Sequence, residues 1–208
     1  MVLSLYNLGM LVEGIIFGIL AIKMAFIYRE ERIVASFVFL LFFIVGSVSS
    51  FIIFFWDFLM ITSPVITFFE LFSGALVVMF FFLAALAMIK RYRWFVFPIV
   101  VVIIASFFLF IELLEPQYYL VSRFVFIIAM IFLSLPVIVL YFYLYRITNS
   151  GKALGYSLGM LVLAFAGIAN NFWLELEGLL RIIGSLIIAA ALFGLFDKYL
   201  SNSQPTQN

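Results

Sequence analysis

Residues 33–55 read IVASFVFLLFFIVGSVSSFIIFF, a run of 23 residues without a single charged side chain. A helix that crosses a bilayer needs about 20 mostly apolar residues, because the hydrocarbon core is about 30 Å thick. Residues 94–111 form a second uncharged run. Hydrophobic residues make up 68% of the 208 residues and charged residues 10%, against about 45–50% and about 25% in an ordinary globular protein. We therefore expect an all-α, polytopic membrane protein.

Short polar breaks divide the apolar sequence into seven stretches, each of which is predicted to form one transmembrane helix. The predicted helices cover residues 4–28, 33–55, 65–89, 94–112, 118–145, 153–172 and 178–197. Pro64 and Pro116 stand where helices are expected to begin, a position that tolerates the missing backbone N–H. We expect a single transmembrane domain over residues 1–200, with its first helix retained rather than cleaved as a signal peptide, and a disordered polar tail over residues 201–208.

Lysine and arginine are distributed unequally between the two sides of this predicted bundle. Only Arg123 and Arg181 fall on one side. The nine on the other side are Lys23, Arg29, Arg32, Lys90, Arg91, Arg93, Arg146, Lys152 and Lys198. Because basic residues mark the cytoplasmic side of a membrane protein, we predict a cell-membrane protein with its N-terminus outside and its C-terminus in the cytoplasm. This alternation requires an odd number of helices.

Small residues and phenylalanines form the apolar faces of the predicted helices. Gly14 and Gly18 share one face of the first helix, and Gly155 and Gly159 share one face of the sixth. Since small residues let helix backbones approach closely in lipid, we interpret these stripes as packing within a seven-helix bundle; the alternative is a homo-oligomeric contact. The 29 phenylalanines are concentrated in helices such as 33–55 and 94–112, which are expected to face lipid. A phenylalanine-lined pocket would have the same pattern.

Ionisable residues interrupt the outer portions of the predicted helices that run from outside to inside. These residues are Glu13, Glu70, Arg123 and Arg181. A charge at depth costs at least about 2.5–3.5 kcal/mol, so such residues usually face the bundle and pair. At about 1.5 Å per residue, Glu13 lies about 24 Å from Arg29 and Arg181 about 25 Å from Lys198. These matching depths predict a Glu13–Arg181 ion pair, with Glu177 able to reach Arg181 from one turn away.

The candidate site extends this pair to a polar cluster in the outer half of the bundle. Its predicted members are Glu13, Glu70, Arg123, Asn170, Asn171, Glu177 and Arg181. One interpretation is purely structural, with the charges joining the first helix to the last. The other is an outward-open pocket that binds a small polar or cationic ligand.

Several classes of function lack the residues they need. The chain has no histidine and no cysteine, and we therefore expect no metal site and no cofactor. A net charge of +1 does not favour a nucleic-acid partner. We expect no enzymatic activity, because the two aspartates, Asp57 and Asp197, fall on opposite sides of the membrane and provide no catalytic pair.

The predicted topology resembles that of seven-helix receptors and microbial rhodopsins. Residues 181–197 contain no lysine to hold a retinal, and the sequence KRYR at 90–93 does not match the acidic-Arg-Tyr motif of G-protein-coupled receptors. The chain is more similar to the membrane sensor modules of prokaryotic, including archaeal, signalling proteins. Its architecture of many helices and the polar edge YREER at 28–32 carry this likeness.

The resemblance implies a sensor, a receptor-like protein or an interaction subunit with an outward-facing polar pocket. Its partners would be the lipid bilayer, and either a second copy or a separate cytoplasmic effector, because only about ten residues follow the last predicted helix. The alternative is a small-solute transporter or channel, including one coupled to cations or protons. Pro136, which is predicted to kink the fifth helix, and the buried carboxylate of Glu13 favour that alternative.

Overall fold

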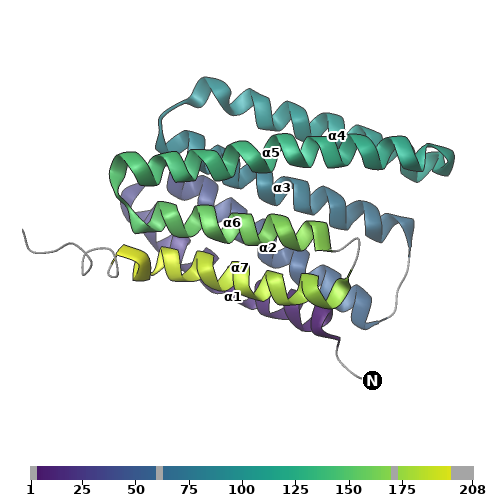
Figure 1. Cartoon of the computed structure of the whole chain (residues 1–208), viewed down its shortest axis with the longest axis horizontal. Coiled ribbons are helices and arrows are strands. Elements are labelled where there is room, and N and C mark those ends of the chain that lie inside the picture. The colour runs from purple at the N-terminus through teal and green to yellow at the C-terminus, as the bar shows by residue number, and fades with distance from the viewer. Residues whose placement is uncertain (1–3, 60–62, 170–172, 198–208) are drawn as a thin grey trace, which may run out of the picture. The chain divides into compact units, whose positions relative to one another are not determined.

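A computed structural model describes residues 4–59, 63–169 and 173–197, and these residues are helical with no β-strand among them, as the sequence predicts (Figure 1). The α-helices are α1 (Leu5–Glu31), α2 (Val34–Phe58), α3 (Pro64–Met88), α4 (Val96–Leu114), α5 (Tyr119–Thr148), α6 (Gly151–Ala169) and α7 (Leu174–Leu192). Two short 3-10 helices, Tyr92–Phe95 and Pro116–Tyr118, precede α4 and α5.

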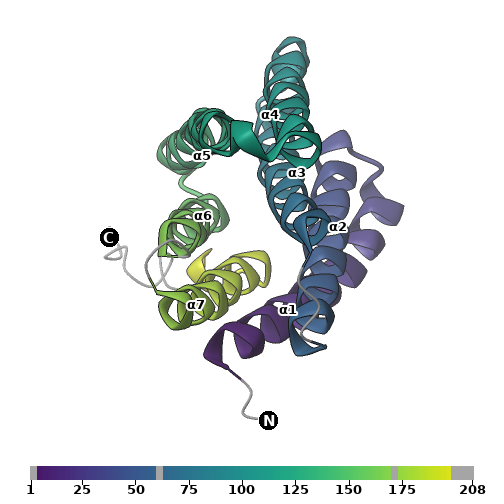
Figure 2. The ribbon, with the colours of Figure 1, turned by 90° about the vertical axis from the view of Figure 1, so that its right-hand side faces the viewer.

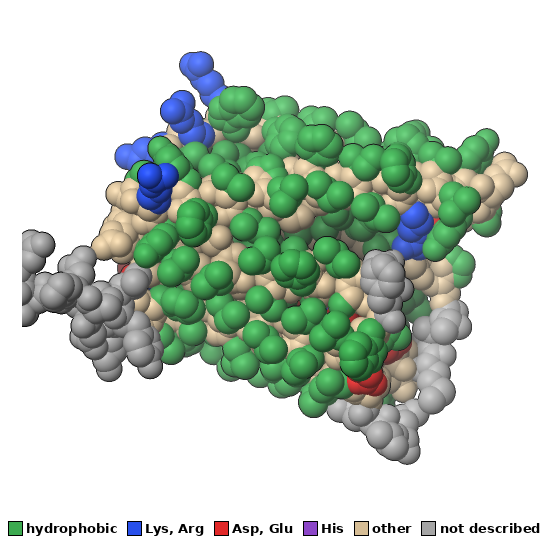
Figure 3. Space-filling model, viewed as in Figure 1, with side chains coloured by type: hydrophobic (Ala, Val, Ile, Leu, Met, Phe, Trp, Pro, Cys, Tyr) green, Lys and Arg blue, Asp and Glu red, His purple; other side chains and the backbone are tan. Residues whose placement is uncertain are grey.

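Helices α1 to α6 are each long and apolar enough to cross a membrane. Hydrophobic side chains cover most of the face of the molecule drawn in Figure 3. Helix α7 has a similar length, but it carries Glu175, Glu177 and Arg181 within its 19 residues. The chain is thus an all-helical protein with six candidate membrane spans among its described residues.

Helix α7 differs most from its predicted range of 178–197. It starts at Leu174, directly after an extended Trp173, and it ends at Leu192. Gly194, with a φ of 75°, adopts the left-handed conformation that commonly terminates a helix. The apolar residues on either side of this glycine conceal the stop in the sequence. Because the helix begins at Leu174, Glu177 lies inside it and not in the preceding loop, where we expected it.

Three short links between helices share a left-handed residue. The positive φ values are 52° at Arg32, 57° at Lys90 and 50° at Asn149, each immediately after the last turn of a helix. The backbone N–H of Arg32 donates to Tyr28 O (2.8 Å), and that of Asn149 donates to Tyr145 O (2.8 Å). These links reverse the chain within a few residues, so that α2, α4 and α6 each follow closely on the helix before.

By its contacts the chain divides into two compact units. One unit is Glu13–Pro136, and the other combines Met1–Val12 with Val137–Asn208. Both boundaries fall inside helices, namely α1 and α5. The single domain expected over residues 1–200 stays a prediction.

In the unit Glu13–Pro136, α1 and α3 lie against α2 (Figure 2). Buried aromatic rings form both contacts. The ring of Phe42 lies 5.4 Å from that of Phe17 on α1 and 4.7 Å from that of Phe81 on α3. All three side chains are fully buried. The expectation that the phenylalanines of α2 face lipid is therefore wrong for this face of the helix, whereas α4 exposes most of its apolar residues.

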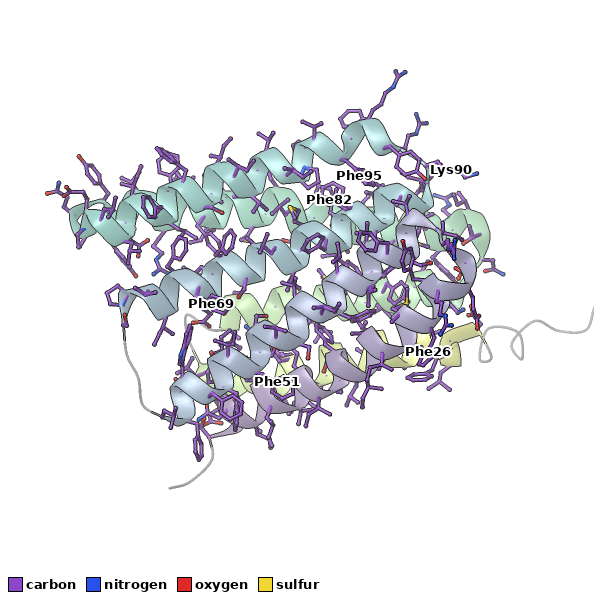
Figure 4. All side chains as sticks on the ribbon, turned by 180° about the vertical axis from the view of Figure 1, so that it is seen from behind. Phe26, Phe51, Phe69, Phe82, Lys90 and Phe95 are labelled. Carbon is purple, nitrogen blue, oxygen red and sulfur yellow. The ribbon has the colours of Figure 1, made fainter. Side chains whose placement is uncertain are left out.

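A polar contact accompanies this aromatic core at the α1–α2 interface. The Ser47 hydroxyl donates to the Gly14 carbonyl oxygen on α1 (2.8 Å), and the ring of Phe51 lies in van der Waals contact with Gly14. The small residues of the first helix thus serve helix packing, as predicted. Figure 4 shows Phe26 and Lys90 at one end of this unit, with Phe51 and Phe69 toward the opposite end.

In the second unit, α6 and α7 lie side by side (Figures 1 and 2). A Cβ added to Gly159 of α6 would lie 2.5 Å from the Ile188 side chain and 3.2 Å from the Gly184 carbonyl oxygen of α7. The Ser157 hydroxyl donates to the Ile138 carbonyl oxygen of α5 (3.1 Å). The glycine stripe of the sixth predicted helix therefore packs against α7 within the chain.

Candidate functional site

A groove opens between α3, α4 and α5 in the unit Glu13–Pro136. It has a volume of about 510 Å³ and a mostly apolar wall. The lining residues are Ser63, Pro64, Thr67, Phe68, Leu71, Leu109, Glu112, Leu113, Pro116, Tyr119 and Arg123. They come from the first two turns of α3, the last two turns of α4, and the start of α5. A volume of this size suits a small molecule or one end of a longer ligand.

An ion pair lies in the wall of this groove. The Arg123 guanidinium donates to Glu112 Oε1 from both Nε (3.1 Å) and Nη2 (2.9 Å). Both side chains are largely buried, with 16% of the Glu112 side chain and 25% of the Arg123 side chain exposed. The guanidinium carbon also lies 5.1 Å from the centre of the Tyr119 ring, a cation–π contact that holds the arginine against α5.

The helical hairpin of α4 and α5 explains why these two residues meet. Glu112 is in the last turn of α4, and Arg123 is in the second turn of α5. The 3-10 helix Pro116–Tyr118 reverses the chain midway between them. Residues equally distant from the turn of an antiparallel hairpin lie opposite each other, so the pairing follows from the local fold.

The second carboxylate oxygen of Glu112 is left without a hydrogen bond. Oε2 is inaccessible to solvent, and none of the described residues donates a hydrogen bond to it. A buried acceptor without a donor costs about 1–3 kcal/mol, and more when it is charged. The wall of the groove therefore holds a negatively charged acceptor without a donor, beside a guanidinium and on an apolar background.

The hydroxyl-bearing residues at the start of α3 complete the polar part of the wall. Ser63 caps α3 by accepting a hydrogen bond from Val65 N on its side-chain oxygen (3.2 Å). Its carbonyl oxygen accepts hydrogen bonds from Ile66 N (2.9 Å) and Thr67 N (3.3 Å). These amide groups of the helix N-terminus are thus already bonded, and the positive charge of the groove comes from Arg123.

A second ion pair has the same form in the other unit. The Arg181 guanidinium donates to Glu177 Oε1 from Nε (2.8 Å), and its Nη2 lies 2.7 Å from the same oxygen. Glu177 is fully buried, and its Oε2 has no hydrogen-bond partner among the described residues. Glu175, on the first turn of α7 with Glu177, accepts a hydrogen bond from the backbone N–H of Leu5 at the start of α1 (2.9 Å).

The predicted site residues are distributed over both units. Glu177 pairs with Arg181, as their spacing suggests, and Arg123 lines the groove. Glu70 is on α3 but is not among the residues that line the groove, and Glu13 is buried on α1. The predicted Glu13–Arg181 ion pair joins residues of different units and stays a prediction, while Asn170 and Asn171 lie outside the described residues.

Glu112 is the site residue that our sequence analysis missed. Its opposite charge to Arg123 and the equal distance of the two residues from the Pro116 turn could have identified the pair. Among the described residues, no group of three acidic side chains is placed to hold a metal ion. No protein-family model, curated protein or solved structure matches the chain.

Proposed function

We propose that the chain is a seven-span protein of the cell membrane that acts as a sensor, receptor-like protein or interaction subunit through an outward-facing pocket. The groove between α3, α4 and α5 is the pocket. The observation that carries this proposal is the buried, unpartnered Glu112 Oε2 in the groove wall. A ligand with a hydrogen-bond donor would satisfy that oxygen. By contacting the ends of three helices, it would favour one arrangement of these helices over another, as a ligand-dependent conformational change requires.

The distribution of charge supports an outward position for the groove. In the unit Glu13–Pro136, the basic links at 29–32 and 90–93 belong to the same end as Phe26 and Lys90 (Figure 4). The groove lies toward the opposite end of α3. At that end, Arg123 is the one basic residue among the described residues of this unit. Because basic residues mark the cytoplasmic side, the groove faces outward in the proposed topology.

Helix α7 is the proposed seventh span. Its three charged residues are confined to its first two turns, and the 11 residues from Ile182 to Leu192 carry no charge. In the proposed orientation those two turns reach the outer part of the membrane, and the Glu177–Arg181 pair lowers the cost of burying either charge alone.

The absence of cysteine makes a direct topological test straightforward. Single cysteines would be introduced at Gln117, at Thr67 in the groove, and at Arg93 on the opposite end of the unit. In intact cells, a membrane-impermeant maleimide is expected to label Gln117→Cys and Thr67→Cys, and to label Arg93→Cys only after permeabilisation. Labelling of Arg93→Cys before permeabilisation, with Gln117→Cys protected, would overturn the proposed orientation.

A cation- or proton-coupled transporter is the second candidate function, and Glu177 favours it. Its carboxylate is fully buried and retains one oxygen without a hydrogen bond. Carboxylates within membrane spans are frequent sites of ion or proton binding. Proteoliposomes containing the wild-type chain would then show solute-dependent proton or cation flux that Glu177→Gln abolishes. Wild-type vesicles as tight as protein-free vesicles would exclude this candidate.

A further inference from the structure

The groove combines three features that together restrict its ligand. Its wall is mostly apolar, its one cation and one anion are adjacent and cancel, and a single carboxylate oxygen lacks a donor. An apolar wall selects an apolar body. A charge-balanced pair disfavours a ligand with a net charge, because the excess charge would be left uncompensated in a low-dielectric site.

The bonding of the Glu112–Arg123 pair shows what the head of the ligand must supply. Arg123 directs two of its five N–H donors to Glu112 Oε1, and a quarter of its side chain is exposed. Glu112 Oε2 requires a hydrogen-bond donor. The complement of this pair is a head group with a cationic N–H donor and an anionic group separated by a short linker.

We propose that the groove binds a membrane phospholipid whose head group carries a primary ammonium next to its phosphodiester. This inference rests on the proposed function, whose pocket it assigns to a ligand class. The Glu112 carboxylate turns so that Oε2 meets the ammonium, which donates to it, and the phosphodiester accepts from the N–H groups of Arg123 that Glu112 leaves unused. The acyl chains follow the apolar wall of Phe68, Leu71 and Leu109 into the bilayer.

Two common head groups lack part of this complement. A quaternary trimethylammonium carries the same charge but has no N–H, so it leaves Glu112 Oε2 without a hydrogen bond. A glycerol head on a phosphodiester has hydroxyl donors, but it brings a net negative charge to a site whose own charges already balance. The primary-ammonium phospholipid is therefore favoured over both.

The test uses the full chain in detergent micelles with lipids that share the same acyl chains. The head groups are ethanolamine, its N-methyl and N,N-dimethyl derivatives, choline and glycerol, and bound lipid is counted by native mass spectrometry. Affinity is expected to fall about tenfold at the step from dimethyl to trimethyl, where the last N–H is lost, which corresponds to about 1.4 kcal/mol. Equal affinity for the ethanolamine and choline lipids would overturn the proposal.

Two variants test whether this head-group selectivity arises in the groove. Glu112→Gln is expected to abolish the preference for ethanolamine over choline, whereas Glu115→Gln is expected to retain it. Glu115 is the matched control, because it is exposed, lies three residues away, and does not line the groove. Unchanged selectivity in folded Glu112→Gln would overturn the assignment. If that variant does not fold, the methylation series on the wild-type chain still decides the question.

Soluble glycerophosphoethanolamine separates a lipid site from a site for a free head group. We expect it not to displace the bound lipid at equal concentration, and displacement would overturn the lipid assignment. The head-group selectivity is also measured independently of the cysteine-labelling experiment. Outward labelling of Thr67→Cys without head-group selectivity would leave the proposed pocket intact and remove only this ligand. Head-group selectivity without outward labelling would keep this ligand and contradict the proposed outward orientation of the pocket.

Discussion

Gly9 of α1 and Gly178 of α7 bring their backbones into direct contact. A Cβ added to Gly9 would lie 2.6 Å from the Gly178 carbonyl oxygen, and one added to Gly178 would overlap the Leu5 carbonyl oxygen. No other residue type fits at such a distance, because the obstruction is backbone and cannot rotate away. Together with the hydrogen bond from Leu5 N to Glu175 (2.9 Å), this contact joins the start of α1 to the start of α7.

Gly178→Ala is therefore expected to lower the free energy of unfolding by about 1–3 kcal/mol, as overpacking does. The measurement is the unfolding midpoint in mixed micelles of mild detergent and SDS. Gly74→Ala is the matched control, because an added Cβ meets open space there. In that helix the extra methyl should be neutral or stabilise by about 0.5–1 kcal/mol. Equal midpoints for the two variants would show that the α1–α7 contact is absent.

The buried aromatic cluster gives the second prediction. Phe42→Ala removes a fully buried ring in contact with Phe17 and Phe81, and it is expected to destabilise the protein by about 3 kcal/mol through the cavity left behind. Phe107→Ala on α4 removes a ring that is 60% exposed and should change the unfolding midpoint little. A larger loss at Phe107 than at Phe42 would contradict the assignment of α2 to the core.

The Glu112–Arg123 pair can be measured by a double-mutant cycle. Each single variant, Glu112→Gln or Arg123→Gln, leaves the partner charge largely buried and is expected to cost about 1–3 kcal/mol. The double variant leaves no charge uncompensated, so its cost should be smaller than the sum of the two. Thermal unfolding in detergent gives the four values. Simple additivity would show that the two residues do not interact.

The left-handed links predict a substitution that does not destabilise the protein. Lys90 has a φ of 57°, a conformation that costs an L-residue about 1–2 kcal/mol and a glycine almost nothing. Lys90→Gly should therefore be neutral or raise the unfolding midpoint, despite the greater flexibility of the unfolded chain. Lys90→Val should lower the midpoint, because a β-branched residue is strained at positive φ. The reverse order would contradict the left-handed link.

The Glu13–Arg181 pair predicted from the sequence is tested in the same way. Glu13 is buried, and Arg181 bonds to Glu177 at 2.8 Å. A cycle of Glu13→Gln and Arg181→Gln is expected to show a coupling of about 0.5–3 kcal/mol if the three charges form one network. The measurement is the free energy of unfolding of the four proteins, from unfolding midpoints in mixed micelles of mild detergent and SDS. Single variants that match both the double variant and the wild type would exclude the pair.

The sequence alone predicts the helices well, because their physical causes are local. Uncharged runs such as 33–55 exceed the thickness of a bilayer, and the positions of α2 and α3 agree with prediction to within three residues. The end of α7 was missed, because a left-handed glycine terminates the helix inside an apolar run that continues beyond it. Composition reports where a helix is apolar, but only backbone geometry reports where it stops.

The site was less predictable, because it depends on which helix faces meet. Arg123 was identified as a candidate, but its partner Glu112 was not, because the pair forms only where the end of α4 meets the start of α5. The phenylalanines of α2 were assigned to lipid for a related reason. Helix periodicity does not distinguish a face that packs on α1 and α3 from one that contacts acyl chains when both are apolar.

The three charges of α7 also bear on the order of biogenesis. Among the described helices of 19 residues or more, α7 is the one that is not apolar enough by itself to cross a membrane, because it carries three charges. It is also the last of them to leave the ribosome. By then the first turns of α1 and the glycine face of α6, which it contacts, have already been synthesised. In the proposed seven-span topology, late insertion would let this charged helix enter the bilayer beside neighbours that already accommodate it.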